Sequence, residues 1–141
     1  MSKRILVIEP SPTLRAILVL YFERDGHQVA LFEDYEAAVQ ALPHFQAEPP
    51  DLAFVALDSR RPACFRILTL LRQYYGWTKL IVMLAQEESK QLGMQNQLRA
   101  VRAIALLKPF SIKEVLALVA DAGHTSSDAP SITSVERDGN A

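Results

Sequence analysis

Five short runs of hydrophobic residues alternate along the chain with segments in which hydrophobic residues recur at helical spacing. Continuous runs of this length are typical of strands that are buried on both faces of a parallel sheet. Helices on both faces complete such a sheet. The pattern therefore predicts an α/β fold, with a five-stranded, doubly wound parallel sheet and five helices. The predicted strands cover residues 5–8, 27–32, 52–57, 80–84 and 101–107.

Local signals set the helix boundaries. Ser11 before Pro12 is a typical helix start, and Gly26 supplies a left-handed stop for the same helix. The helix over 86–99 is expected to be the weakest and most mobile, because Gly93 lies inside it and few of its hydrophobic residues share a face. The last helix is expected to begin at a capping box formed by Ser111 and Glu114. The two other predicted helices cover residues 34–42 and 63–75.

Composition separates the chain into two parts. The whole chain has 141 residues, of which 50% are hydrophobic and 22% charged, and these values are typical of one globular domain. Residues 123–141 are rich in Ser, Asp and Gly and contain almost no hydrophobic side chains. We therefore expect a domain over residues 1–122, followed by a disordered tail or linker.

Charge and hydropathy exclude several function classes. The net charge is −1, so direct binding to nucleic acid or to an anionic membrane is not expected. No hydrophobic stretch approaches the roughly 18 residues of a membrane span, and the start of the chain has no cleavage pattern, so a cytoplasmic protein is expected. Cys64 is the single cysteine, without a second ligand at zinc spacing, and is interpreted as a packed small side chain.

Charged residues follow the predicted strands at their carboxyl ends. Glu9 follows the first strand, Asp58 comes just after the third, and Lys108 closes the fifth before Pro109. In a doubly wound sheet, ligands bind in the crevice beyond these ends. We therefore expect Glu9 and Lys108 to meet at this edge of the sheet, near Ala56 or Asp58.

These strand ends resemble the receiver domain of two-component response regulators, over residues 3 to 121. The resemblance implies a flavodoxin-like sheet order of 2-1-3-4-5 and a signalling role through protein partners, among them a histidine kinase, without enzymatic activity. Lys108-Pro109 resembles the cis peptide of the family. Receivers move a phosphoryl group onto an aspartate, using bound Mg²⁺ and a lysine.

Two registers compete for the phospho-acceptor position. In the family, Pro-Asp-Leu is followed by three hydrophobic residues and then by the acceptor. Matched from Pro50, this pattern places Ala56 at the acceptor position, and the match continues without a gap into the next helix. The family spacing of an acceptor four residues before a proline is instead met by Asp58 and Pro62. Asp58 lies two residues further along, about 6.6 Å for an extended strand. The acceptor position is therefore either a degenerate Ala56 or an alternative acceptor at Asp58.

Other positions of the resemblance are altered as well. Glu9 matches the first acidic residue, but Pro10 stands where the family has its direct metal ligand. Leu84 replaces the hydroxyl residue of strand four, and Ala105 replaces the aromatic switch of strand five, while Lys108 is retained. Mg²⁺ requires several hard oxygen ligands. Glu9 and Asp58 remain as weak candidates, and tight Mg²⁺ binding is not expected.

Three functions fit this pattern to different degrees. The first is a pseudo-receiver that binds protein partners without being phosphorylated, and the second is an active phospho-switch that uses Asp58. The third is a cofactor-binding enzyme of the flavodoxin type, which is disfavoured because Pro10 and Pro12 remove backbone donors from the first loop. A homodimer through the face of Arg99, Arg102 and Lys113 is a further hypothesis.

Overall fold

The structure is a computed structural model that describes residues 2–45 and 47–121. The chain divides into two compact units, Met1–Phe110 and Ser111–Ala141. The tail predicted over residues 123–141 lies outside the described residues.

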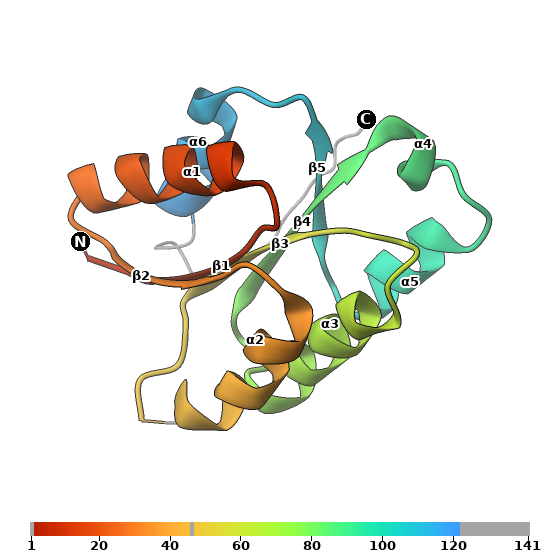
Figure 1. The fold of residues 1–141 in the computed structure, drawn as a ribbon, viewed down its shortest axis with the longest axis horizontal. Coiled ribbons are helices and arrows are strands. Elements are labelled where there is room, and N and C mark those ends of the chain that lie inside the picture. The colour runs from red at the N-terminus through yellow and green to blue at the C-terminus, as the bar shows by residue number, and fades with distance from the viewer. Residues whose placement is uncertain (1, 46, 122–141) are drawn as a thin grey trace. The chain divides into compact units, whose positions relative to one another are not determined.

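The first unit is built around a five-stranded parallel sheet with the strand order β2-β1-β3-β4-β5 (Figure 1). Every residue of β3 is buried, as the unbroken hydrophobic run predicted. The predicted five-stranded sheet and its order are confirmed. The strands are β1 (Arg4–Ile8), β2 (Gln28–Phe32), β3 (Leu52–Ala56), β4 (Lys79–Ala85) and β5 (Ile104–Lys108).

Helices of the first unit cover both faces of this sheet. Helix α1 (Pro12–Arg24) lies on one face, and α2 (Tyr35–Ala41) and α3 (Pro62–Tyr74) lie on the other (Figure 1). Phe22 of α1 packs on Phe54 of β3, with ring centroids 5.2 Å apart. The 3₁₀ helix η1 (Leu42–Phe45) extends α2. The doubly wound arrangement is therefore confirmed.

The single helix predicted over residues 86–99 is wrong, because the structure has two short helices there. These are α4 (Gln86–Ser89) and α5 (Met94–Ala100). Gly93 lies between them at φ 83°, a left-handed conformation that interrupts a helix and that glycine adopts without steric cost. The described residues therefore hold six α-helices, one more than predicted. The mobility expected of this segment stays a prediction.

The second unit is described through helix α6 (Ile112–Asp121). Its predicted capping box is present, since the Ser111 N–H donates to Glu114 Oε1 at 2.8 Å and the Glu114 N–H donates to Ser111 Oγ at 3.1 Å. Among the described residues of both units, no helix is long and apolar enough to cross a membrane.

His27 is expected to make the stability of the first unit depend on pH. Its Nδ1 accepts the Lys3 N–H at 3.0 Å. Burial lowers the pKa of His27, and the positive charge of Lys3 lowers it further. A depressed pKa means that the contribution of His27 to stability is complete above its unfolded pKa of about 6.5 and is lost as the pH falls below that value. Denaturant unfolding at a series of pH values should show this loss, and His27→Gln should make the dependence shallower.

Candidate functional site

The carboxyl ends of the parallel strands meet at one edge of the sheet, and most of the residues selected from the sequence lie there. Glu9 directly follows β1, and Ala56 is the last residue of β3. Lys108, the last residue of β5, is in register with Ala85, the last residue of β4. Parallel strands bring these positions together although they are far apart in the sequence.

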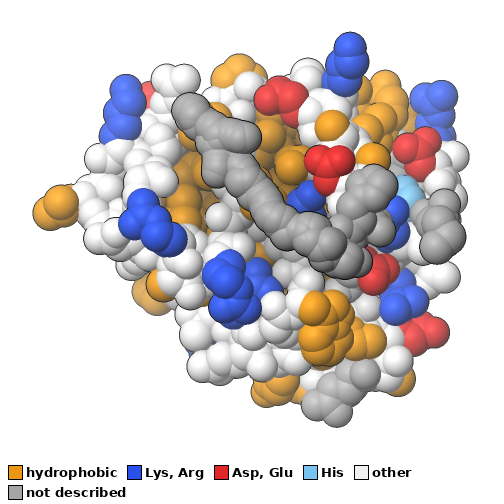
Figure 2. All heavy atoms as spheres, turned by 180° about the vertical axis from the view of Figure 1, so that it is seen from behind, with side chains coloured by type: hydrophobic (Ala, Val, Ile, Leu, Met, Phe, Trp, Pro, Cys, Tyr) orange, Lys and Arg blue, Asp and Glu red, His pale blue; other side chains and the backbone are white. Residues whose placement is uncertain are grey.

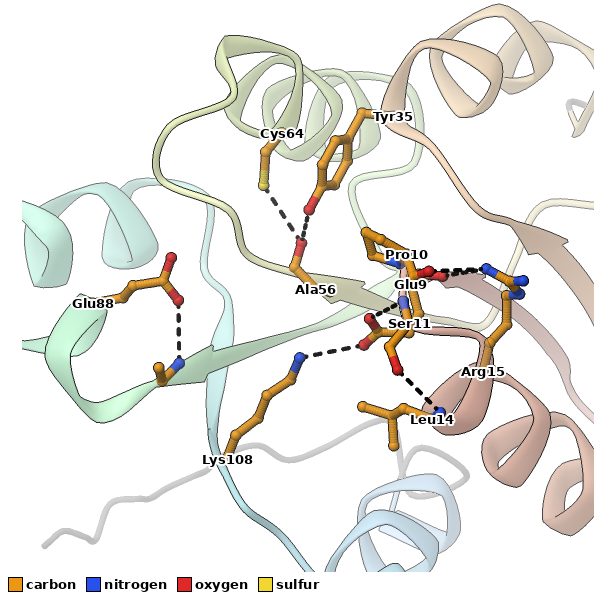
Figure 3. A network of polar contacts seen from close by, with 11 residues as sticks. Glu9, Pro10, Ser11, Leu14, Arg15, Tyr35, Ala56, Cys64, Glu88 and Lys108 are labelled. Carbon is orange, nitrogen blue, oxygen red and sulfur yellow. Dashed lines mark hydrogen bonds and ion pairs between the residues drawn. The ribbon is translucent and has the colours of Figure 1, made fainter.

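Glu9 and Lys108 form an ion pair at this edge, as expected. Lys108 Nζ lies 3.4 Å from Glu9 Oε1 (Figure 3). The second carboxylate oxygen, Oε2, accepts the Ser11 N–H at 2.9 Å. The side chain of Glu9 is only 2% exposed, whereas that of Lys108 is 34% exposed. Each oxygen of the buried carboxylate therefore has a partner within the protein. The Lys108-Pro109 peptide is cis, as the resemblance implied.

The backbone carbonyl of Ala56 is held by two side chains from the helices on one face. Tyr35 donates its hydroxyl to this oxygen, and the Cys64 thiol lies 3.6 Å from it. Burial is the main cause that raises the pKa of each of these two side chains, so both remain protonated donors. Figure 3 shows both approaching Ala56 from the side away from Lys108. The side chain of Ala56 is a methyl group and cannot act as a nucleophile.

Removing the Tyr35 hydroxyl tests this arrangement. Tyr35→Phe should lower the free energy of unfolding by about 1–2 kcal/mol, because a buried carbonyl loses its stronger donor. Tyr74→Phe is the matched control, since Tyr74 is 42% exposed, and its effect should be near zero. Denaturant unfolding of both variants gives the comparison, and equal losses would contradict the role assigned to Tyr35.

Asp58 lies beyond the end of β3 and is engaged by its own loop. Its Oδ1 accepts the Arg60 N–H at 3.0 Å and Arg60 Nε at 3.1 Å, and Oδ2 lies 3.4 Å from Arg60 Nη2. The hydrogen bonds from Arg60 lower the pKa of Asp58. Among the described residues, no hydrogen bond or ion pair joins Asp58 to Glu9 or Lys108. The side chain of Asp58 is 25% exposed and can be reached by solvent.

The remaining selected residues offer no ligand or switch group. Pro10 is exposed, and its carbonyl accepts Arg15 Nη1 at 3.3 Å. Leu84 is fully buried in the core between the sheet and α3. Ala105 is an exposed position of β5 that carries only a methyl group.

The residues at this edge do not fit a tightly bound Mg²⁺ ion. Such a site needs hard oxygen ligands in near-octahedral geometry. Pro10 has no side-chain oxygen, and both oxygens of Glu9 already have partners. In the part of the chain that the structure describes, no group of three or more His, Cys, Asp or Glu side chains is placed to hold a metal ion.

Glu88 is a site residue that the sequence analysis did not select. Its Oε1 accepts the Ala85 N–H at 3.2 Å, and its Oε2 accepts the Ser59 N–H at 3.2 Å. The carboxylate thus joins the end of β4 to the β3–α3 connection. An acidic residue just after a strand was a usable signal for the first contact, but Ser59 is 29 residues away and no local pattern predicts that contact.

Comparison of the sequence with protein-family models and with curated proteins gives no match. Comparison of the structure gives many matches among solved structures. A CheY-like response regulator receiver domain from Methanospirillum hungatei JF-1 superposes with a TM-score of 0.73 at 15% sequence identity, over 86% of this chain and 93% of that chain. The non-phosphorylated HemR receiver domain from Leptospira biflexa gives 0.73 at 18% identity, over 91% and 99%.

A third example is the signal receiver domain of a putative Luxo repressor protein from Vibrio parahaemolyticus, with a TM-score of 0.69 at 20% identity, over 86% of this chain and 90% of that chain. At these identities the comparison establishes the fold, and the chemistry must be argued from the residues present. Sheet order, helix placement and superposition agree, and the chain has the fold of a CheY-like response regulator receiver domain.

Proposed function

We propose that this chain is a cytoplasmic signal-transduction module of the receiver type that binds protein partners and does not accept a phosphoryl group. The observation that supports this most strongly is the end of β3. Its last residue, Ala56, carries a methyl group at the position where, by the resemblance to receivers, a carboxylate nucleophile is expected. Phosphoryl transfer cannot proceed at a position without a nucleophile.

The surrounding residues support the same proposal. Phosphoryl transfer in a receiver uses a lysine to offset charge on the phosphoryl group and a metal to bridge its oxygens. Here Lys108 is paired with Glu9, and Pro10 supplies no metal ligand. We infer that Lys108 holds the edge of the sheet together, and that Mg²⁺ is not a cofactor.

Asp58 supports a second candidate, a phospho-switch that receives a phosphoryl group from a histidine kinase. Its side chain is 25% exposed, and the hydrogen bonds from Arg60 lower its pKa, which favours the ionised carboxylate. One observation speaks against this candidate: both oxygens of the Asp58 carboxylate already accept hydrogen bonds from Arg60. The arginine would have to move before the carboxylate could attack phosphorus.

Beryllofluoride with Mg²⁺, a mimic of the phosphoryl group, separates the two candidates. Amide NMR spectra of the protein should stay unchanged on its addition if the first candidate is correct. Chemical-shift changes at Ala85 and Lys108 that disappear in Asp58→Ala would establish the second candidate instead. Arg60→Ala is a useful further variant, because it frees the Asp58 carboxylate without adding a nucleophile.

A further inference from the structure

The net charge of the chain is close to zero, but acidic and basic residues are distributed unevenly along the sequence. Residues 1–58 contain nine acidic residues and four Lys or Arg, whereas residues 59–110 contain nine Lys or Arg and only two acidic residues. The two acidic residues of the second segment, Glu87 and Glu88, both lie in α4, at the carboxyl end of β4. No acidic residue occurs in residues 59–86, which lead into the opposite, amino-terminal end of this strand. Asp51, just before β3, is the acidic residue next to that end, because its carbonyl accepts the Lys79 N–H at 2.9 Å.

An exposed aromatic pair lies at that amino-terminal end. Trp77 is 68% exposed in the connection between α3 and β4, and Tyr74 is 42% exposed at the end of α3. Between them, Tyr75 is buried and its ring contacts both, at centroid distances of 5.9 Å from Tyr74 and 6.3 Å from Trp77. Tyr75 also donates its hydroxyl to the carbonyl of Leu42. A buried, hydrogen-bonded ring therefore supports the two exposed ones.

Two arginines fix the backbone that carries this pair. Arg72 Nη1 and Arg102 Nη2 both donate to the Gly76 carbonyl, at 2.8 and 3.2 Å. Burial lowers the pKa of Arg72, and the positive charge of Arg102 lowers it further, as expected for two guanidinium groups that lie close together. Among the described residues, no ion pair with an acidic side chain includes either arginine.

The backbone at Arg102 is strained. Arg102 has φ 53°, and it is the one described residue other than glycine with a positive φ. An arginine in this conformation is uncommon and costs free energy relative to glycine. In this conformation the Arg102 guanidinium donates to the carbonyl of Gly76, the residue before Trp77. A glycine at position 102 would leave no positive charge there.

We propose that Trp77, Tyr74, Arg72 and Arg102 form a docking surface for a protein segment in which carboxylates flank an aliphatic side chain. Tryptophan, tyrosine and arginine are the residues that dominate binding energy at protein interfaces. A fixed backbone reduces the entropy lost on binding. The aliphatic side chain would cover Trp77, and the carboxylates would face Arg72 and Arg102, which form no ion pair with an acidic side chain among the described residues.

An acidic protein segment fits this surface better than nucleic acid does. Phosphates are bound by arginines with free donors. Arg72 instead donates to the backbone carbonyls of Gly76, Thr78, Val101 and Arg102. Most of its donors are therefore engaged, for a carboxylate as for a phosphate. Nucleic acid binds through many phosphate contacts, and Arg72 and Arg102 are too few for that, whereas a short acidic segment needs only one or two cationic partners. Figure 2 shows that both hydrophobic side chains and Lys and Arg side chains are exposed on the back of the molecule.

This surface is separate from the site at the other edge of the sheet. The seven residues of β4 separate the two ends of that strand by about 20 Å. The inference rests on the proposed role in protein binding, but the two can fail separately. Beryllofluoride reports on the carboxyl-terminal edge, and a peptide titration reports on the aromatic pair.

Titration of the full chain with a short synthetic peptide, two leucines flanked by aspartates, tests the proposal. Trp77 is the single tryptophan, so its fluorescence reports directly on the surface. We expect a blue shift of its emission on binding, and an affinity that falls as salt rises from about 50 to about 300 mM. By calorimetry, Trp77→Ala should weaken binding by about tenfold or more. Arg102→Gly should weaken it several-fold and should keep the fold, because glycine relieves the strained φ.

Leu20→Ala and Arg24→Ala are matched controls, since both residues are exposed on α1, and neither should change the affinity. No binding at millimolar peptide, or equal binding by wild type and Trp77→Ala, would overturn the proposal. Two other results would also overturn it. One is tighter binding of a single-stranded oligonucleotide with the same sensitivity to the variants, and the other is self-association that covers Trp77 without any peptide.

Discussion

Lys108→Met is expected to lower the free energy of unfolding by about 2–3 kcal/mol. The substitution leaves the Glu9 carboxylate, which is only 2% exposed, without its positive partner, and removal of one member of a buried ion pair is strongly destabilising. The expected loss is smaller than for a fully buried pair, because 34% of the Lys108 side chain is exposed and solvent screens the interaction. Denaturant unfolding at neutral pH gives the value.

A double-mutant cycle shows whether this loss comes from the pair itself. Glu9→Gln alone should cost less than Lys108→Met, because it leaves a lysine that can turn to solvent. The double variant should be more stable than the sum of the two losses predicts, by about 1 kcal/mol. Lys90→Met, at an exposed position, is the matched control for the loss of one positive charge. Purely additive losses would mean that the two side chains do not interact, and Lys108 would then be free to serve a ligand.

Arg72→Ala is expected to cost about 3 kcal/mol, since hydrogen bonds from a charged donor contribute more than neutral ones. The guanidinium binds the carbonyls of Val101, Thr78 and Gly76 at 2.7, 2.9 and 2.8 Å, and so ties α3 to the starts of β4 and β5. Arg72→Lys should recover little, because one ammonium group cannot reach carbonyls in several directions. Thermal and denaturant unfolding give the comparison.

Arg66→Ala is the control for this prediction, because Arg66 lies on the same helix and is exposed. Its loss should stay within about 0.5 kcal/mol. Equal losses for the two alanine variants would show that Arg72 acts only through helix propensity or net charge, and would remove the support for a fixed backbone at Trp77.

The sequence predicted those features that depend on regular spacing. Unbroken hydrophobic runs identified the strands, and the rule that parallel strands end at one edge predicted the contact between Glu9 and Lys108, which are 99 residues apart. The contacts of Tyr35 with Ala56 and of Glu88 with Ser59 were not predictable in this way. Each depends on the direction of a side chain across a loop, and spacing along the chain carries no information about that direction.

Two other features were present in the sequence and were misread. Gly93 was recognised as a weak point of a helix, but its left-handed conformation ends the helical register altogether. The net charge of −1 averages over residues 1–58, which have nine acidic and four basic residues, and residues 59–110, which have two acidic and nine basic residues. An average over the chain cannot describe a local electric field, and a window along the sequence would have revealed the separation.

Intact mass after incubation with a small phosphodonor and Mg²⁺ tests the central claim most directly. The wild-type protein should keep its mass. A variant with Pro10→Asp and Ala56→Asp restores the two missing carboxylates and serves as the positive control, which should gain one phosphoryl group. A phosphoryl group gained by the wild type and abolished by Asp58→Ala would contradict the claim and make this chain an active phospho-switch.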